Sequence, residues 1–86
     1  MYSREYYQQL DTNLRKVVTD IQTIGNFLPN DLAELMDYLD AGEYGLAFDV
    51  LSFLILDKHL PLNGSTQDLM NSLANQMGLP GLPTDE

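Results

Sequence analysis

The residues of this chain that could do chemistry are mainly carboxylates, and their spacing fits neither a metal loop nor a catalytic pair. Asp37, Asp40 and Glu43 lie close to one another and flank Gly42. A calcium loop of the EF-hand type requires Asp or Asn at every second position before its glycine and a Glu that closes the loop, and this segment has neither. Two carboxylates can also serve as acid and base in glycoside hydrolysis, but any acidic helix offers such a pair. The spacing of these acids therefore indicates neither a calcium site nor an enzyme.

The other candidate groups lack the neighbours that their chemistry needs. The chain has no Cys and a single histidine, so thiolate metal sites are excluded. His59 follows Lys58 and is expected to be a loop residue or a cation near a helix end, because a metal or general-base role would need partners. Neither Ser52 nor Ser72 stands in the Asp-Ser-Leu motif to which an acyl carrier protein attaches its phosphopantetheine. We therefore expect no enzymatic activity, no cofactor and no bound metal.

Charge is the feature that points to a binding role. The formal net charge is −9, and the stretch between Val17 and Asp57 contains no Lys or Arg but holds eight of the 13 acids. The electric field of so negative a protein repels nucleic acid and anionic lipid, and it speeds encounter with a basic surface. We expect a protein partner with a basic surface, and neither nucleic acid nor a membrane. The alternative is that the acids only form a solvated surface, although such surfaces usually mix both signs of charge.

The sequence also indicates where the protein resides. Its first ten residues, MYSREYYQQL, lack the apolar core of a signal peptide. The most apolar run, residues 50–56, is far shorter than the ~20 residues that span a bilayer. The lack of cysteine fits a reducing compartment. We therefore expect a cytoplasmic protein.

The apolar residues of the first segment predict one long helix over residues 3–27. They recur at steps of three and four, which places all of them on one stripe. The stripe consists of Tyr7, Leu10, Leu14, Val17, Ile21, Ile24 and Leu28. Ser3 is the expected N-cap, and Gly25 with Pro29 marks the end. Such a stripe can cover the core of a bundle, which we favour, or form a dimeric coiled coil.

The second segment predicts a helix over residues 30–41 that presents acids to solvent. Asn30 or Asp31 can cap its start, and Gly42 is the expected residue after its end. At about 100° per residue, the leucines of this helix share one side and its acids the other. The acidic side consists of Glu34, Asp37 and Asp40, with Tyr38 at its edge.

The third segment, residues 43–58, predicts a helix that is apolar on most sides. A helix of this kind is normally the central one of a small bundle. Gly45 and Ala47 are small, so they are expected to let a neighbouring helix approach closely. Asp49 and Ser52 share its polar stripe.

The last segment predicts a fourth helix over residues 65–77. Ser65 to Asp68 has the form of a capping box, and Gly78 is expected to end the helix. The tail, about residues 79–86, contains three prolines and is expected to fray. The chain is therefore expected to be all-α: one helical domain over residues 1–86, folded as a small bundle of about four helices with a largely buried third helix.

One segment resembles a known family. Residues 36–51 read MDYLDAGEYGLAFDVL, and Leu60-Pro61-Leu62 follows as a turn. This run resembles the signature of small bacterial immunity proteins, the MafI-type proteins and their relatives in contact-dependent growth inhibition (CDI). In that signature an acidic residue precedes a G-E-[YW]-G-L-A-[FL]-[DE]-x-L pattern. The resemblance covers roughly residues 31–78.

The resemblance implies an antitoxin-like role in the cytoplasm. Proteins of this family bind the C-terminal toxin domain of a contact-dependent or polymorphic bacterial toxin, and many of those toxins are nucleases with basic grooves, including EndoU-like ribonucleases. The implied mechanism is occlusion of the groove by an acidic face, in which aromatic residues beside the acids anchor the partner. The candidate partner-binding residues are Asp31, Glu34, Asp37, Tyr38, Asp40, Glu43 and Tyr44. The alternative is a homodimeric helical adaptor that uses the first helix and has no toxin partner.

Overall fold

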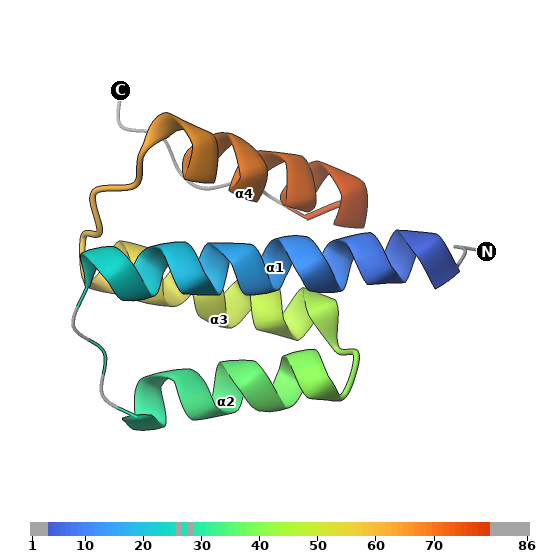
Figure 1. Ribbon diagram of the computed structural model, residues 1–86, viewed down its shortest axis with the longest axis horizontal. Coiled ribbons are helices and arrows are strands. Elements are labelled where there is room, and N and C mark those ends of the chain that lie inside the picture. The colour runs from blue at the N-terminus through green and yellow to red at the C-terminus, as the bar shows by residue number, and fades with distance from the viewer. Residues whose placement is uncertain (1–3, 26, 28, 80–86) are drawn as a thin grey trace.

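The computed structural model describes residues 4–25, 27 and 29–79, and every regular element in them is a helix (Figure 1). The elements are α1 (Arg4–Ile24), α2 (Pro29–Asp40), α3 (Tyr44–Asp57) and α4 (Gly64–Met77). This confirms the predicted all-α fold with four helices. The predicted N-cap Ser3 and nearly all of the predicted frayed tail lie outside the described residues.

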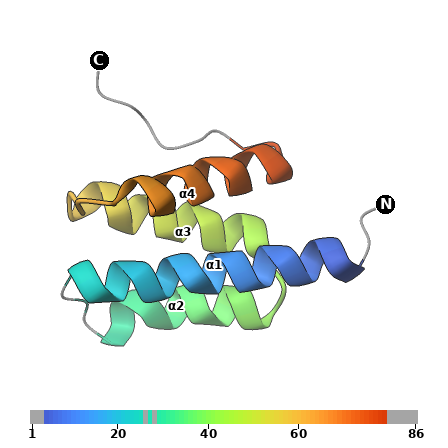
Figure 2. The same cartoon turned by 45° about the horizontal axis from the view of Figure 1, so that its top comes forward.

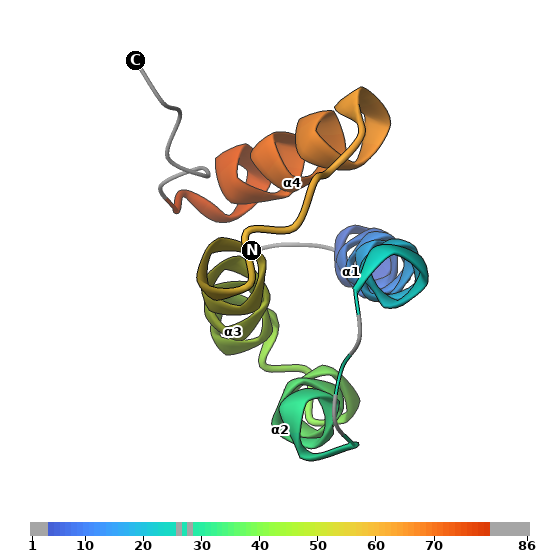
Figure 3. The ribbon, with the colours of Figure 1, turned by 90° about the vertical axis from the view of Figure 1, so that its left-hand side faces the viewer.

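The four helices form a flat bundle rather than a square one. Helices α1 and α3 lie side by side, while α2 and α4 lie on opposite sides of this pair (Figures 2 and 3). Accordingly α2 packs mainly on α3, and α4 packs mainly on α1. The molecule measures 35 × 32 × 17 Å, so it has two broad sides and a short third dimension.

The core is built from the middle of the stripe that the spacing of apolar residues predicts for the first helix. Its members Tyr7 and Ile24 are 45% and 42% exposed, and Leu28 lies outside the described residues. Leu10, Leu14, Val17 and Ile21 are at most 2% exposed and pack in one cluster with residues of the other three helices. Burying such side chains contributes about 1.5–3 kcal/mol each. A homodimer through this stripe would have to expose residues that the chain uses for its own core.

Helix α3 is less enclosed than its composition predicts. Five of its residues are buried, namely Ala47, Phe48, Leu51, Leu54 and Ile55. Its outer side remains open within the described part of the chain, because α2 and α4 flank the α1–α3 pair and none of the described helices lies beyond α3 (Figure 3). Leu46, Phe53 and Leu56 are 47%, 64% and 45% exposed on this side.

Two predicted caps are wrong. Asn30 and Asp31 lie inside α2, which begins at Pro29, a residue whose fixed φ suits the first helical position. Helix α4 begins at Gly64 and not at the predicted capping box, because Asn63 is the N-cap and its side chain accepts a 2.8 Å hydrogen bond from the Thr66 amide. The predicted end at Gly78 is confirmed: its φ is +68°, and the amide of Leu79 donates to the Ala74 carbonyl.

Two glycines at the corner between α2 and α3 differ in what they do. Gly42 has a φ of +75°, which L side chains adopt at a cost, so it makes the turn possible. The expectation that Gly45 admits a close helix neighbour is wrong, because a Cβ built there would meet nothing within 4 Å.

This difference predicts opposite effects on stability. Gly42→Ala should lower the free energy of unfolding by about 1–2 kcal/mol, because alanine is strained in the left-handed region. Gly45→Ala, the matched control inside the first turn of α3, should leave it unchanged or raise it by up to about 1 kcal/mol, because alanine favours helix. Urea unfolding of both variants measures this, and equal effects would show that the corner is not held by Gly42.

Candidate partner-binding surface

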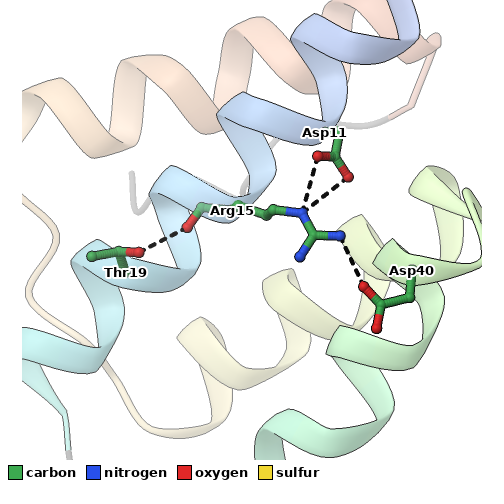
Figure 4. A network of polar contacts seen from close by, with 4 residues as sticks. All are labelled: Asp11, Arg15, Thr19 and Asp40. Carbon is green, nitrogen blue, oxygen red and sulfur yellow. Dashed lines mark hydrogen bonds and ion pairs between the residues drawn. The ribbon is translucent and has the colours of Figure 1, made fainter.

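The seven candidate residues do not form one face, because two of them mark opposite edges of α2. Asp40 Oδ1 lies 3.0 Å from the Nη2 atom of Arg15 on α1 (Figure 4). Asp31 Oδ2 lies 3.6 Å from the Nζ atom of Lys58, the residue that caps the end of α3. One edge of α2 therefore adjoins α1, and the other adjoins α3.

Arg15 joins two helices through a small polar network (Figure 4). Its Nε atom lies 3.0 Å from both carboxylate oxygens of Asp11, while its Nη2 atom donates to Asp40. Hydrogen bonds, the stronger effect from Asp40 and the weaker from Asp11, raise the pKa of Arg15 above its usual value. Asp40 is thus partly neutralised within the chain, and it is a weaker candidate for contact with a basic partner than its sequence position indicates.

The few cations of the chain are largely occupied by acids of the chain itself. Arg15, Lys16 and Lys58 all form ion pairs in the described structure, and the whole chain has only four Lys and Arg residues. Several exposed acids have no ion-pair partner within the described residues. They include Glu34, Asp37, Glu43, Asp49 and Asp57. Negative charge without a paired cation in the described structure therefore remains on α2, on α3 and at the corner between them.

The edge of α2 that adjoins α3 carries part of the predicted site. Glu34 and Tyr38 lie three and seven residues after Asp31, so they share its edge of the helix. Glu34 is exposed, whereas Tyr38 is half-buried and packs against the core. Beside this edge lies the open side of α3. Asp37, three residues after Glu34, is its neighbour on the outer side of α2. We call the combined area the α2–α3 surface, which consists of Glu34, Asp37, Tyr38, Leu46, Asp49 and Phe53.

Sequence reasoning missed the apolar part of this surface. Leu46, Asp49 and Phe53 are spaced three and four residues apart, so the signal for one stripe was present. What the sequence could not supply is the side of α3 that stays uncovered, because that depends on where α2 and α4 pack. Exposed aromatic residues are enriched in protein interfaces, and charged groups around them steer the encounter.

Glu43 and Tyr44 lie at the corner before α3, where the Glu43 amide donates to the Tyr38 carbonyl at one end of the α2–α3 surface. There they line a pocket of about 360 Å³ together with Tyr6, Tyr7 and Met77. The Tyr44 ring stacks on Tyr7 with 6.3 Å between ring centroids. Burial raises the pKa of Tyr44 above its usual value, and the nearby negative charge of Asp11 raises it further. Sequence reasoning placed Glu43 and Tyr44 at the start of the third helix, where the structure has them, but missed the tyrosines of α1.

The described residues offer no alternative site of the other kinds that the sequence raised. In the part of the chain that is described, no group of three or more His, Asp or Glu side chains is placed to hold a metal ion. His59 is exposed in the loop after α3. None of the described helices is both long and apolar enough to cross a membrane.

Comparison with known proteins leaves this surface as the main guide to function. No family model matches the chain, and no curated protein or solved structure is significantly similar to it.

Proposed function

We propose that this chain is an immunity protein that binds and neutralises the C-terminal toxin domain of a contact-dependent or polymorphic bacterial toxin, a nuclease with a basic groove. The observation that carries the proposal is the α2–α3 surface, where exposed acids without ion-pair partners in the described structure adjoin exposed apolar side chains. The motif resemblance over residues 36–51 supplies the class of partner.

The two parts of the α2–α3 surface have different tasks in this proposal. Glu34, Asp37 and Asp49 attract the basic groove over distance and raise the association rate. Phe53, which is 64% exposed, leaves water on binding and slows dissociation, as buried aromatic anchors do in other interfaces. Stable interfaces bury about 800 Å² on each partner. A broad side of 35 × 32 Å provides enough area for such a contact.

Inhibition in this proposal is steric and electrostatic. The bound surface fills the groove that would otherwise hold the phosphates of a nucleic acid, and its carboxylates take the places of those phosphates beside Lys and Arg of the toxin. The chain itself needs no catalytic group or cofactor for this task. It acts in the cytoplasm, where the toxin would meet its substrate.

The experiment that tests the proposal uses the reading frame immediately upstream of this gene. We expect that frame to encode a large secreted protein with a basic C-terminal domain. Expression of that domain alone in bacteria should stop growth, and co-expression of this chain should restore it. If the toxic domain kills equally with and without this chain, and the purified pair does not associate, the proposed function is wrong.

A further inference from the structure

A pocket of about 360 Å³ lies where four helix ends meet, at the corner between α2 and α3. Its wall includes Tyr6 and Tyr7 from the start of α1, Glu43 and Tyr44 from the start of α3, and Met77 from the end of α4. This volume is near the lower limit of about 300 Å³ for small-molecule pockets, so it suits one side chain better than a larger ligand.

Three aromatic rings from two helices are held together in this wall. The Tyr6 ring meets the Tyr7 ring edge-on at 5.4 Å, and the Tyr7 ring stacks on Tyr44 at 6.3 Å. The hydroxyl of Tyr6 donates a 2.6 Å hydrogen bond to the carbonyl of Gln76, which fixes this ring between α1 and α4. The faces of such rings carry negative charge density and attract cations.

The charges at the pocket also favour a cation. None of its described lining residues is Lys or Arg, and the exposed carboxylate of Glu43 has no ion-pair partner in the described structure. Arg4 lines a neighbouring cleft that shares Tyr7 and Tyr44, and it does not line this pocket. The helix dipoles oppose one another here, because α1 and α3 begin at the pocket while α2 and α4 end near it. Glu43 is thus the one charged side chain among the described lining residues, and the negative charge of Asp11 also lies close enough to act on Tyr44.

We propose that this pocket receives an arginine side chain of a basic protein partner, with the guanidinium against the tyrosine rings and paired to Glu43. Arginine fits better than lysine because its planar, weakly hydrated head stacks on aromatic faces and forms directed bonds to a carboxylate. The proposal rests on the proposed function only for the identity of the protein that carries the arginine. The pocket would add a specific anchor point to the less specific attraction of the α2–α3 surface.

The test uses a small probe and no toxin, so its result is independent of the proposed function. N-acetyl-arginine methylamide is titrated into the isotope-labelled full chain and followed by NMR. We expect saturable shifts, in the millimolar range, at the rings of Tyr6, Tyr7 and Tyr44 and at the amides of Gly42 and Gly45. The neutral citrulline analogue should produce none of these shifts, and the lysine analogue should bind more weakly. Equal binding of the citrulline or the lysine analogue would overturn the proposal.

Two variants and one control locate the bound cation. Glu43→Gln should weaken binding of the arginine probe by up to about fivefold, the usual range for an exposed ion pair. Tyr7→Leu should weaken it by about two- to fivefold through loss of one ring, whereas Tyr7→Phe should retain binding. Asp68→Asn removes the same charge as Glu43→Gln from an exposed position nine residues before Met77 on α4. If Asp68→Asn weakens the probe as much as Glu43→Gln, the attraction is diffuse and the pocket is not the site.

Discussion

Replacing Leu51 by alanine is expected to lower the free energy of unfolding by about 2–5 kcal/mol, the range for a leucine truncated in a rigid core. Leu51 is 0% exposed and belongs to the cluster that joins all four helices. A domain of this size has a total stability of about 4–13 kcal/mol, so the loss is a large share of the whole. Urea unfolding followed by circular dichroism should show a much lower midpoint with an unchanged slope.

The same helix provides a matched control. Leu46→Ala removes the same atoms from α3, but Leu46 is 47% exposed on its open side. Its effect should stay within about 0.5 kcal/mol, as for other surface substitutions. If Leu51→Ala and Leu46→Ala lower the free energy of unfolding by equal amounts, the side of α3 that faces the core has been assigned wrongly.

Replacing Phe53 by alanine is expected to weaken the proposed complex with a toxin domain by about thirtyfold or more, the loss of about 2 kcal/mol that defines an interface hot spot. The loss should appear in the dissociation rate, because truncation of an apolar anchor leaves long-range attraction intact. The free protein should unfold at nearly the same urea concentration as before, since Phe53 is 64% exposed.

Ile24→Ala is the control for this variant. Ile24 is another large exposed apolar residue, 42% exposed, at the end of α1 and outside the α2–α3 surface. Surface plasmon resonance should find its dissociation rate equal to that of the unchanged chain. A Phe53→Ala protein that dissociates no faster than Ile24→Ala would remove Phe53 from the interface.

The fold could be predicted from the sequence because its signals are local. The three- and four-residue spacing in α1 identifies the residues that become the core, and the predicted helix ends lie within three residues of those observed. The N-cap Asn63 was missed because several neighbouring residues could serve, and the competition is decided by which hydrogen bond forms.

The candidate site could be predicted only in part, because it depends on contacts between distant segments. Asp40 looked available from its own helix, but Arg15, 25 residues earlier in the chain, pairs with it. Tyr7 and Tyr44 share a wall only after α1 and α3 pack together. Acidic composition indicated the kind of partner, whereas the packing of the helices determines which acids remain available to it.

The most direct test of the central claim is the association rate of this chain with the toxin domain that we propose the upstream reading frame to encode, measured by stopped flow at low and high salt. Glu34, Asp37 and Asp40 are the acids that the sequence places on the solvent side of the second helix, but Asp40 already pairs with Arg15. Glu34→Lys with Asp37→Lys is therefore the better variant, and it changes the net charge from −9 to −5 because each substitution adds two. Asp68→Lys with Asn71→Lys and Asn75→Lys makes the same total change (2 + 1 + 1 = 4) on exposed positions of α4.

For the unchanged chain we expect fast association that slows steeply as salt shortens the Debye length from about 30 Å at 0.01 M to about 3 Å at 1 M. At low salt the association rate of the Glu34→Lys, Asp37→Lys chain should be at most about one tenth of that of the unchanged chain. This rate should also depend little on salt. The α4 variant should remain much closer to the unchanged chain. Either of two results would show that the toxin does not dock on the α2–α3 surface. The α2 variant could associate as fast as the unchanged chain at every salt concentration, or the α4 variant could associate as slowly as the α2 variant.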